Sequence, residues 1–142
     1  MTAPETETWA CDTSMAIAAL DPNHVRHASC RRWLIDHRPV LSGHAAFETY
    51  SVLTRLPPPL RLTARQAASA LAAAFPVTCW PRSDHLDALR ARFGELGVIG
   101  GSVYDGLVGQ AALDHGRVLL TCDRRAERTY RALGVRFQPV EQ

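Results

Sequence analysis

Short apolar runs alternate with longer segments of helical pattern along the chain. The apolar runs predict strands over residues 9–11, 40–42, 77–80, 118–121 and 135–137. The segments between them predict helices over residues 14–20, 23–37, 45–56, 63–74, 83–93, 102–115 and 124–133. Such alternation is typical of a parallel sheet with helices on both faces. We therefore expect an α/β fold with three layers, α/β/α, around a mainly parallel central sheet of about five strands.

Proline marks two of the predicted boundaries. Asp21-Pro22 is expected to end one helix and to open the next, because proline suits the first helical turn. The prolines at 57–59 are expected to stop the third helix and to hold the following segment extended. No internal repeat or long linker divides the chain. We expect one domain over residues 1–142, with residues 1–7 as a flexible N-terminal tail.

The composition is that of an ordinary globular protein, with 46% hydrophobic and 21% charged residues. No apolar run is long enough to span a membrane, and the acidic N-terminus lacks the plan of a signal peptide. We therefore expect a cytoplasmic protein without membrane association. All sixteen cationic side chains are arginines, and the net charge is only +2. This charge gives no strong basic footprint for nucleic acid, and the absence of lysine removes every mechanism that needs one.

The four cysteines are widely scattered and form no CxxC pair; they are Cys11, Cys30, Cys79 and Cys122. This spacing argues against a structural zinc site, and nothing indicates an oxidising compartment. We expect reduced thiols that pack as small hydrophobic side chains.

Four carboxylates stand where ligands bind in a parallel α/β sheet. Asp12 and Asp123 each follow a predicted strand at its C-terminal end, which borders the ligand crevice of such sheets. Asp105 falls in the first turn of the helix that leads to the strand before Asp123. Glu48 lies one turn into the helix after the second strand. If the sheet order brings these elements together, three or four carboxylates converge on one crevice.

Helix capping is the alternative explanation for each acid taken singly. Asp12 and Asp123 occupy N-cap positions, and aspartate is a favoured N-cap. Ser102-x-x-Asp105 has the pattern of a capping box, and Glu48 would suit a helix N-terminus. For any single residue, capping is the stronger interpretation.

Capping does not explain the set as a whole. Two carboxylates 4 Å apart repel by about 4 kcal/mol at an effective dielectric constant of ~20, whereas each cap contributes only ~1 kcal/mol. Oxygen ligands without organised histidine or cysteine partners suit Mg²⁺ or Mn²⁺. The chain also has no G-x-S-x-G motif and no phosphate-binding glycine loop. These observations favour metal-assisted hydrolysis of a phosphodiester.

Three segments in order resemble PIN-domain proteins, and more narrowly the VapC-type toxins of bacterial VapBC toxin–antitoxin pairs. The segments are CDTSMAIAAL, FETYSVLTRLP and GGSVYDGLVGQAALDHGRVLLTCDRRAERTYRALGV. The resemblance spans nearly the whole chain. It implies a three-layer α/β/α fold and an endoribonuclease that depends on Mg²⁺ or Mn²⁺ and cuts structured RNA such as tRNA or rRNA. It also implies a homodimer, inhibition by a cognate VapB antitoxin, and a toxin–antitoxin hetero-oligomer.

The resemblance also implies roles for individual residues. The family's four acidic positions correspond to Asp12, Glu48, Asp105 and Asp123, of which the three aspartates are the expected metal ligands and Glu48 either ligates the metal or orients its water. Ser14 and Thr121 correspond to small hydroxyl residues near the site, and Glu127 is the one candidate for a further acid. Arg124, Arg125 and Arg128 either contact the RNA backbone or form a solvated helix face. For His44, one turn before Glu48, packing or hydrogen bonding is favoured over a role in the crevice.

Other functions remain to be weighed. A haloacid-dehalogenase-like phosphatase or a response-regulator receiver also places an aspartate after the first strand, but both need a lysine that this chain lacks. The main alternative is a PIN-like module that binds RNA or protein without catalysis. A metal-dependent DNA nuclease receives little support from the low net charge.

Overall fold

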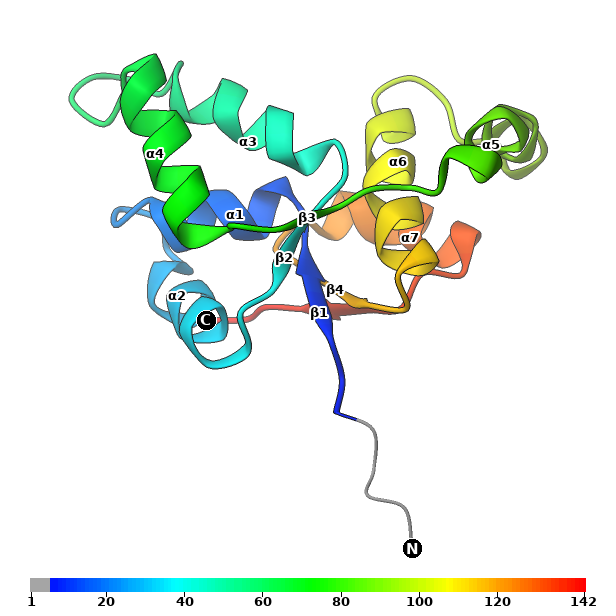
Figure 1. Ribbon diagram of the computed structural model, residues 1–142, viewed down its shortest axis with the longest axis horizontal. Coiled ribbons are helices and arrows are strands. Elements are labelled where there is room, and N and C mark those ends of the chain that lie inside the picture. Colours follow the sequence, from blue (N-terminus) through cyan, green and yellow to red (C-terminus); the bar gives the residue numbers. More distant parts are fainter. Residues whose placement is uncertain (1–5) are drawn as a thin grey trace, which may run out of the picture.

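A computed structural model describes residues 6–142 of the chain, in which helices and strands alternate (Figure 1). The elements are β1 (Trp9–Cys11), α1 (Thr13–Leu20), α2 (His27–His37), β2 (Val40–Ser42), α3 (Ala45–Leu53), α4 (Ala64–Ala74), β3 (Thr78–Cys79), α5 (Ser83–Leu96), α6 (Ser102–Asp114), β4 (Val118–Thr121), α7 (Arg124–Leu133) and β5 (Phe137–Pro139). The predicted tail over residues 1–7 lies, apart from Thr6 and Glu7, outside the described residues. No helix in the described part is long and apolar enough to cross a membrane.

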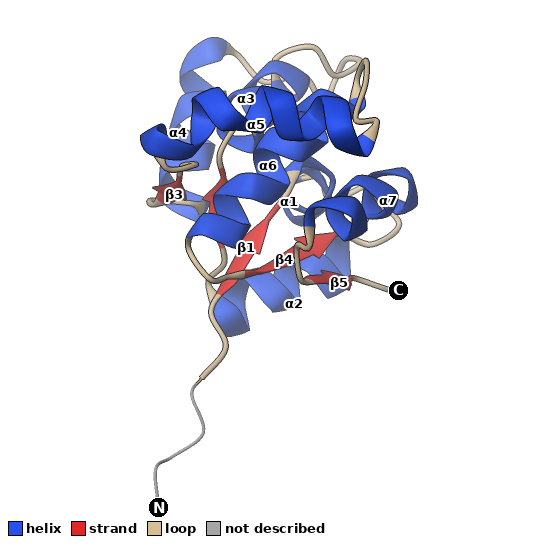
Figure 2. Ribbon diagram, turned by 90° about the vertical axis from the view of Figure 1, so that its right-hand side faces the viewer, coloured by secondary structure: helices blue, strands red, loops and turns tan. Residues whose placement is uncertain are grey.

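The five strands form one sheet with the order β3-β2-β1-β4-β5. Every pairing is parallel. Helix α2 lies on one side of this sheet and α6 on the other (Figure 2). The predicted three-layer α/β/α fold is therefore confirmed. Because β1 is the central strand, the residue that follows it, Asp12, lies in the middle of the sheet edge where ligands bind.

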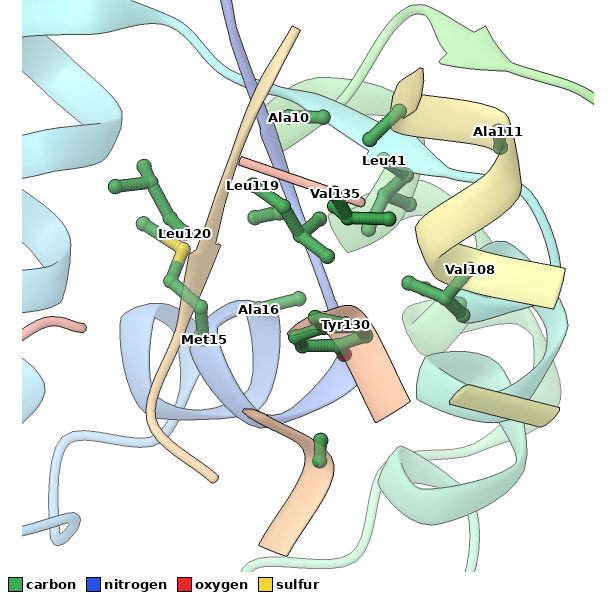
Figure 3. Packing of buried hydrophobic residues seen from close by; sticks show 14 of the residues in the cluster. Ala10, Met15, Ala16, Leu41, Val108, Ala111, Leu119, Leu120, Tyr130 and Val135 are labelled. Carbon is green, nitrogen blue, oxygen red and sulfur yellow. The ribbon is translucent and has the colours of Figure 1, made fainter. Parts of the chain in front are cut away.

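The core occupies both faces of the sheet. All four residues of β4 are buried, and Leu119 and Leu120 point to opposite sides of the strand (Figure 3). Leu120 lies beside Met15 of α1, and Tyr130 of α7 is fully buried. A strand buried on both faces reads as a continuous apolar run, which is why the VLLT segment could be identified from sequence.

Several predicted boundaries were wrong: α3 ends at Leu53 instead of residue 56, and α5 continues to Leu96 instead of ending at residue 93. The prolines at 57–59 do not hold the next segment extended, because the N–H of Leu60 donates to the carbonyl of Pro57 (3.0 Å) and closes a turn.

Two further boundaries have a clear physical reason. Pro22 does not open a helix: residues 22–26 form turns, and α2 begins at His27. The side chain of Asp21 accepts a hydrogen bond from the backbone N–H of Asn23, which stabilises a turn instead of a helical start. The last strand begins at Phe137 instead of residue 135, because the N–H of Val135 still donates to the carbonyl of Tyr130 in the cap of α7.

Candidate active site

The four acidic side chains converge on one edge of the sheet. Asp12 follows β1, Asp123 follows β4, Glu48 lies in the first turn of α3, and Asp105 lies in the first turn of α6. The pKa of Asp105 is raised to about 6, first by burial and then by the negative charges of Asp123, Asp12 and Glu48. Each of the other three carboxylates therefore lies close enough to act electrostatically on Asp105.

Asp12 is buried and held by three hydrogen-bond donors. The Ser14 hydroxyl (2.6 Å) and the Met15 backbone N–H (3.1 Å) donate to its Oδ1, and the Tyr130 hydroxyl donates to its Oδ2 (2.8 Å). Burial raises the pKa of Asp12, whereas these donors oppose that shift. Each carboxylate oxygen can accept about two bonds, so Oδ1 is saturated and Oδ2 keeps one free position.

Hydroxyl groups tie the end of β4 to the start of α1. The Ser14 hydroxyl accepts a hydrogen bond from the backbone N–H of Cys122 (2.8 Å), and its Oγ lies 3.4 Å from the Thr121 Oγ1. The Thr121 hydroxyl in turn accepts from the backbone N–H of Asp123 (3.0 Å). Ser14 and Thr121 thus connect the backbones that carry Asp12 and Asp123.

Capping explains two of the acids. Asp12 is the N-cap of α1 through its bond from Met15, and Asp123 is the N-cap of α7 through a bond from the backbone N–H of Arg125 (2.9 Å). The capping box expected at Asp105 was wrong, because Ser102 lies inside α6 and its hydroxyl bonds to the backbone of Ile99. A pattern of two residues cannot distinguish a cap from a position one step into the helix.

Glu48 and Asp105 form no capping hydrogen bond, although both lie in the first turn of a helix, where a negative charge is favoured. Within the described residues, neither carboxylate accepts a hydrogen bond from a protein group or forms a salt bridge. Both are only partly exposed, so neither charge is fully solvated. For Asp105, burial and the repulsion by the other carboxylates make the charge unfavourable for folding, and this charge requires another explanation.

The donor chemistry fits a hard divalent cation, although the side chains are not closed around one. No three His, Cys, Asp or Glu side chains between residues 6 and 142 stand close enough together to form a ready-made metal cage. The set nevertheless consists of carboxylate oxygens, which suit Mg²⁺ or Mn²⁺. The raised pKa of Asp105 reflects in part a repulsion that a bound cation would relieve.

Basic residues border the site on the side of β4. Arg124, Arg125 and Arg128 are exposed on α7, directly after Asp123. Glu127 lines a cavity of about 280 Å³ together with Asp123, and its carboxylate lies 3.4 Å from the guanidinium of Arg131. Glu127 therefore lies next to the site, but one of its carboxylate oxygens is already paired with Arg131.

Sequence reasoning missed two contributors to the site. Tyr130 lies 118 positions from Asp12 in sequence, and its apolar ring on the buried face of α7 gives no sign that its hydroxyl reaches that carboxylate. Arg26, in the turn before α2, donates to the Cys122 carbonyl (3.0 Å). The sequence offered one general signal, because a buried tyrosine hydroxyl needs a hydrogen-bond partner. That rule does not say which residue the partner is.

The cysteines are free thiols, as predicted. Cys11, Cys30 and Cys79 are buried, whereas Cys122 is partly exposed. The sulfur atoms of Cys30 and Cys122 lie 3.4 Å apart. Cys122 is more than a packing residue, because its backbone holds the Ser14 and Arg26 side chains.

A parallel five-stranded sheet with helices on both faces and acids at its C-terminal edge defines the class of protein. The PIN domain family matches residues 10–132, and the chain belongs to this family. Among its relatives, the chain is 44% identical over 129 residues to Ribonuclease VapC27 of Mycobacterium tuberculosis (strain ATCC 25618 / H37Rv), covering 89% of this chain and 92% of the relative. It is 42% identical over 132 residues to Ribonuclease VapC40 of Mycobacterium tuberculosis (strain CDC 1551 / Oshkosh), covering 91% and 96%. The VapC-type resemblance is thereby confirmed, and the phosphatase and receiver alternatives are removed.

Proposed function

We propose that this protein is a metal-dependent endoribonuclease toxin of the VapC type, which hydrolyses phosphodiester bonds in structured RNA such as tRNA or rRNA. The observation that carries the proposal is the pair Glu48 and Asp105, whose partly buried charges have no structural partner among the described residues. The names of the relatives support ribonuclease activity. A cation and a phosphate substrate would give these charges a role.

The four carboxylates have two roles in this proposal. Asp12, Asp105 and Asp123 would hold Mg²⁺ or Mn²⁺, with the free position on Asp12 Oδ2 available as a ligand. When bound, such an ion neutralises the phosphoryl oxygens and acidifies an attacking water. Glu48 ligates the ion or orients that water. A carboxylate of the set would accept the proton that the attacking water loses.

The surrounding residues position the substrate and the acids. Ser14 and Tyr130 hold the Asp12 carboxylate in one orientation, and Thr121 fixes the backbone of Asp123. The exposed arginines of α7 would bind phosphates that flank the scissile bond; they are Arg124, Arg125 and Arg128. Because guanidinium groups recognise phosphate without reading sequence, these contacts set the register of the RNA rather than its identity.

The toxin assignment brings protein partners with it. We expect a cognate VapB-type antitoxin, a homodimer of this chain and a toxin–antitoxin hetero-oligomer in the cytoplasm. Helices α3 and α4 are the candidates to bind the antitoxin. Only Ala67 of the eleven residues in α4 is buried, so most of this helix is open to a partner.

The deciding experiment incubates purified, antitoxin-free protein with total RNA, with and without Mg²⁺ or Mn²⁺. We expect specific cleavage that requires the metal and that Asp12→Asn abolishes. Asparagine keeps the shape of the side chain and one accepting oxygen, so the variant tests the charge instead of the fold. Equal cleavage by wild type and variant, or cleavage that survives EDTA, would reject the assignment.

The same assay separates the alternatives. RNA binding without any cleavage would indicate the catalytically inactive PIN-like module, for which the open arrangement of the carboxylates is the supporting observation. Cleavage of DNA with RNA left intact would indicate the DNA nuclease. Glu48→Gln serves as a second inactive variant, since Glu48 has no capping role whose loss could disturb folding.

A further inference from the structure

The exposed aromatic side chains of this protein gather in one place. The chain contains ten Phe, Trp and Tyr residues, all within the described part. The three of them that are exposed are Phe47 (66%), Tyr104 (51%) and Trp80 (46%). Exposed aromatic rings are unfavourable in water, so their grouping indicates a binding surface.

These rings form two contacting pairs. The Tyr104 ring stacks on the His44 imidazole, with centroids 4.9 Å apart and planes 24° apart. The Phe47 and Trp80 rings have centroids 5.9 Å apart at an angle of 42°. His44 and Phe47 are three positions apart at the start of α3 and so lie on neighbouring faces of one turn. We call these four side chains the aromatic strip.

The strip begins at the carboxylates. Tyr104 directly precedes Asp105 on α6, and His44 lies one turn before Glu48, whose backbone N–H donates to the His44 carbonyl (3.0 Å). Helices α3 and α6 rise on either side of β3 in Figure 1, and the His44–Tyr104 pair joins their starts.

The strip and the arginines of α7 lie on opposite sides of the carboxylates. In the sheet order β3-β2-β1-β4-β5, Trp80 follows β3 and Phe47 follows β2, whereas α7 follows β4. A chain of nucleotides anchored at the central strand and bound by α7 would therefore continue over the strip.

We propose that the aromatic strip is a stacking subsite for unpaired nucleobases next to the scissile phosphate, with Tyr104 as its principal ring. This inference rests on the proposed ribonuclease function and adds the form of substrate: single-stranded or loop nucleotides whose bases are free to stack. Bases of any sequence stack on aromatic side chains. Each stacked base strengthens binding by about 5- to 150-fold, as measured by replacing the aromatic residue with alanine. Stacking matters here because a net charge of +2 provides little general attraction for RNA.

RNA suits this surface better than a protein partner does. Aromatic residues are also enriched at protein interfaces, so a partner chain is the competing occupant. The strip, however, adjoins Asp105 and Glu48, so a substrate whose phosphate reaches those acids would have neighbouring nucleotides within reach of its rings. An RNA duplex cannot use the strip, because its bases are already stacked and paired.

The test measures binding in the Asp12→Asn background, which excludes cleavage from the readout. The probes are a short single-stranded RNA, an abasic strand with the same backbone, and the matching RNA duplex, each followed by fluorescence anisotropy. We expect Tyr104→Ala to weaken binding of the single strand by about 10-fold and Tyr104→Phe to preserve it, because the ring and not the hydroxyl stacks. Binding of the abasic strand and of the duplex should not change.

Two further variants make the result decisive. Phe47→Ala should also weaken single-strand binding, whereas Ile99→Ala, at an exposed residue (76%) outside the strip, should not. Unchanged binding in both strip variants would overturn the proposal, as would an equal loss on the abasic strand. Unchanged RNA binding with a loss of self-association in size-exclusion chromatography would assign the strip to a protein interface instead. Total-RNA cleavage by the wild type is scored separately, so the proposed function and the stacking subsite can fail independently.

Discussion

At the scale of single residues, the environment of Asp12 shows how a buried charge is kept in place. Its carboxylate receives hydrogen bonds from Ser14, Met15 and Tyr130, and it lies close enough to Asp105 to raise the pKa of that residue. The Tyr130 hydroxyl is itself buried, and burial together with Asp12 raises the pKa of Tyr130 well above its usual value. The phenol therefore stays protonated and acts as a permanent donor to Asp12.

Tyr130→Phe tests this positioning role. The change removes one hydrogen bond to a charged group, and such bonds contribute about 1.5–3 kcal/mol, so the free energy of unfolding should fall by that amount in urea titrations. The Mg²⁺ concentration needed for half-maximal cleavage should rise as well, because Asp12 loses its fixed orientation. Tyr50→Phe is the matched control: the Tyr50 hydroxyl donates no hydrogen bond within the described residues, and that variant should match the wild type in both measurements.

Asp105→Asn tests the repulsion within the cluster. A pKa raised from 3.8 to about 6 means that the folded state binds the proton more tightly than the unfolded chain does. This stabilisation is complete below about pH 4 and is lost as the pH rises through about 6. The variant removes the charge, so in EDTA at about pH 7.5 it should be more stable by about 1 kcal/mol, a value discounted for the partial exposure of Asp105.

Thermal unfolding at a series of pH values measures this effect. The gain in Asp105→Asn should vanish towards about pH 4, and Mg²⁺ should stabilise the wild type more than the variant. Asp36→Asn, at an exposed position on α2, is the control for the loss of a negative charge. A gain of equal size at both ends of the pH range would contradict the explanation.

At the scale of secondary-structure elements, the placement of α6 depends on close approach to its neighbours. A Cβ added at Gly106 would lie 2.6 Å from the Phe93 ring of α5, and one added at Gly109 would lie 3.0 Å from Val135 and 3.2 Å from Tyr130. Glycine therefore lets α6 pack against α5 and α7. Since α6 carries Asp105 and α7 carries Tyr130, this packing sets the geometry of the site.

A pair of glycine substitutions separates packing from helix propensity. Gly106→Ala should lower the free energy of unfolding by about 1–3 kcal/mol, because the added Cβ would force the buried Phe93 ring to shift within the core. Gly94→Ala, in the interior of α5 with no atom within 4 Å of the added Cβ, should raise it by about 0.5–1 kcal/mol. Urea denaturation of both variants checks the prediction, and destabilisation of both by similar amounts would contradict it.

The elements differ in how far sequence alone could predict them. Three strands were located to the residue, since continuous apolar runs such as 118–121 belong to strands buried on both faces. The start of α2 was misplaced because the hydrogen bond to the Asp21 side chain forms a turn where Pro22 suggested a helix. The start of β5 was misplaced because Val135, although apolar, still bonds to the end of α7. The convergence of the carboxylates was expected only if the sheet order brought their elements together, and the structure supplies that order. Contacts such as Tyr130 to Asp12 could not be predicted, because they join residues that only tertiary packing brings together.

At the scale of the whole molecule, the sheet edge that carries the acids has two chemically different sides. The arginines of α7 lie on one side of the acids and the aromatic strip lies on the other. In the proposed binding mode, charge on one side and aromatic rings on the other would give a long substrate a direction. With a net charge of +2, this local arrangement has to supply what a generally basic surface supplies in other nucleic-acid-binding proteins.

Salt dependence measures the basic side of this arrangement. A variant with glutamine at Arg124, Arg125 and Arg128 should bind single-stranded RNA more weakly. The slope of log affinity against log salt should become shallower by about 2, since each phosphate contact on a single strand contributes about 0.7. The control replaces Arg31 and Arg65, which are exposed on α2 and α4, and should keep the slope of the wild type. An unchanged slope in the α7 variant would assign those arginines to a solvated helix face.

The capping bonds of Asp12 and Asp123 also indicate which residues would reveal a loss of activity in related proteins. Both aspartates hold the starts of helices, so a descendant that no longer cuts RNA would still be selected to keep them for folding. Glu48 and Asp105 form no capping hydrogen bond, so selection for folding would hold them less strongly, and they would be the first to be replaced once catalysis ceased. In a newly sequenced chain of this kind, the state of these two positions is therefore the more informative sign of a working enzyme.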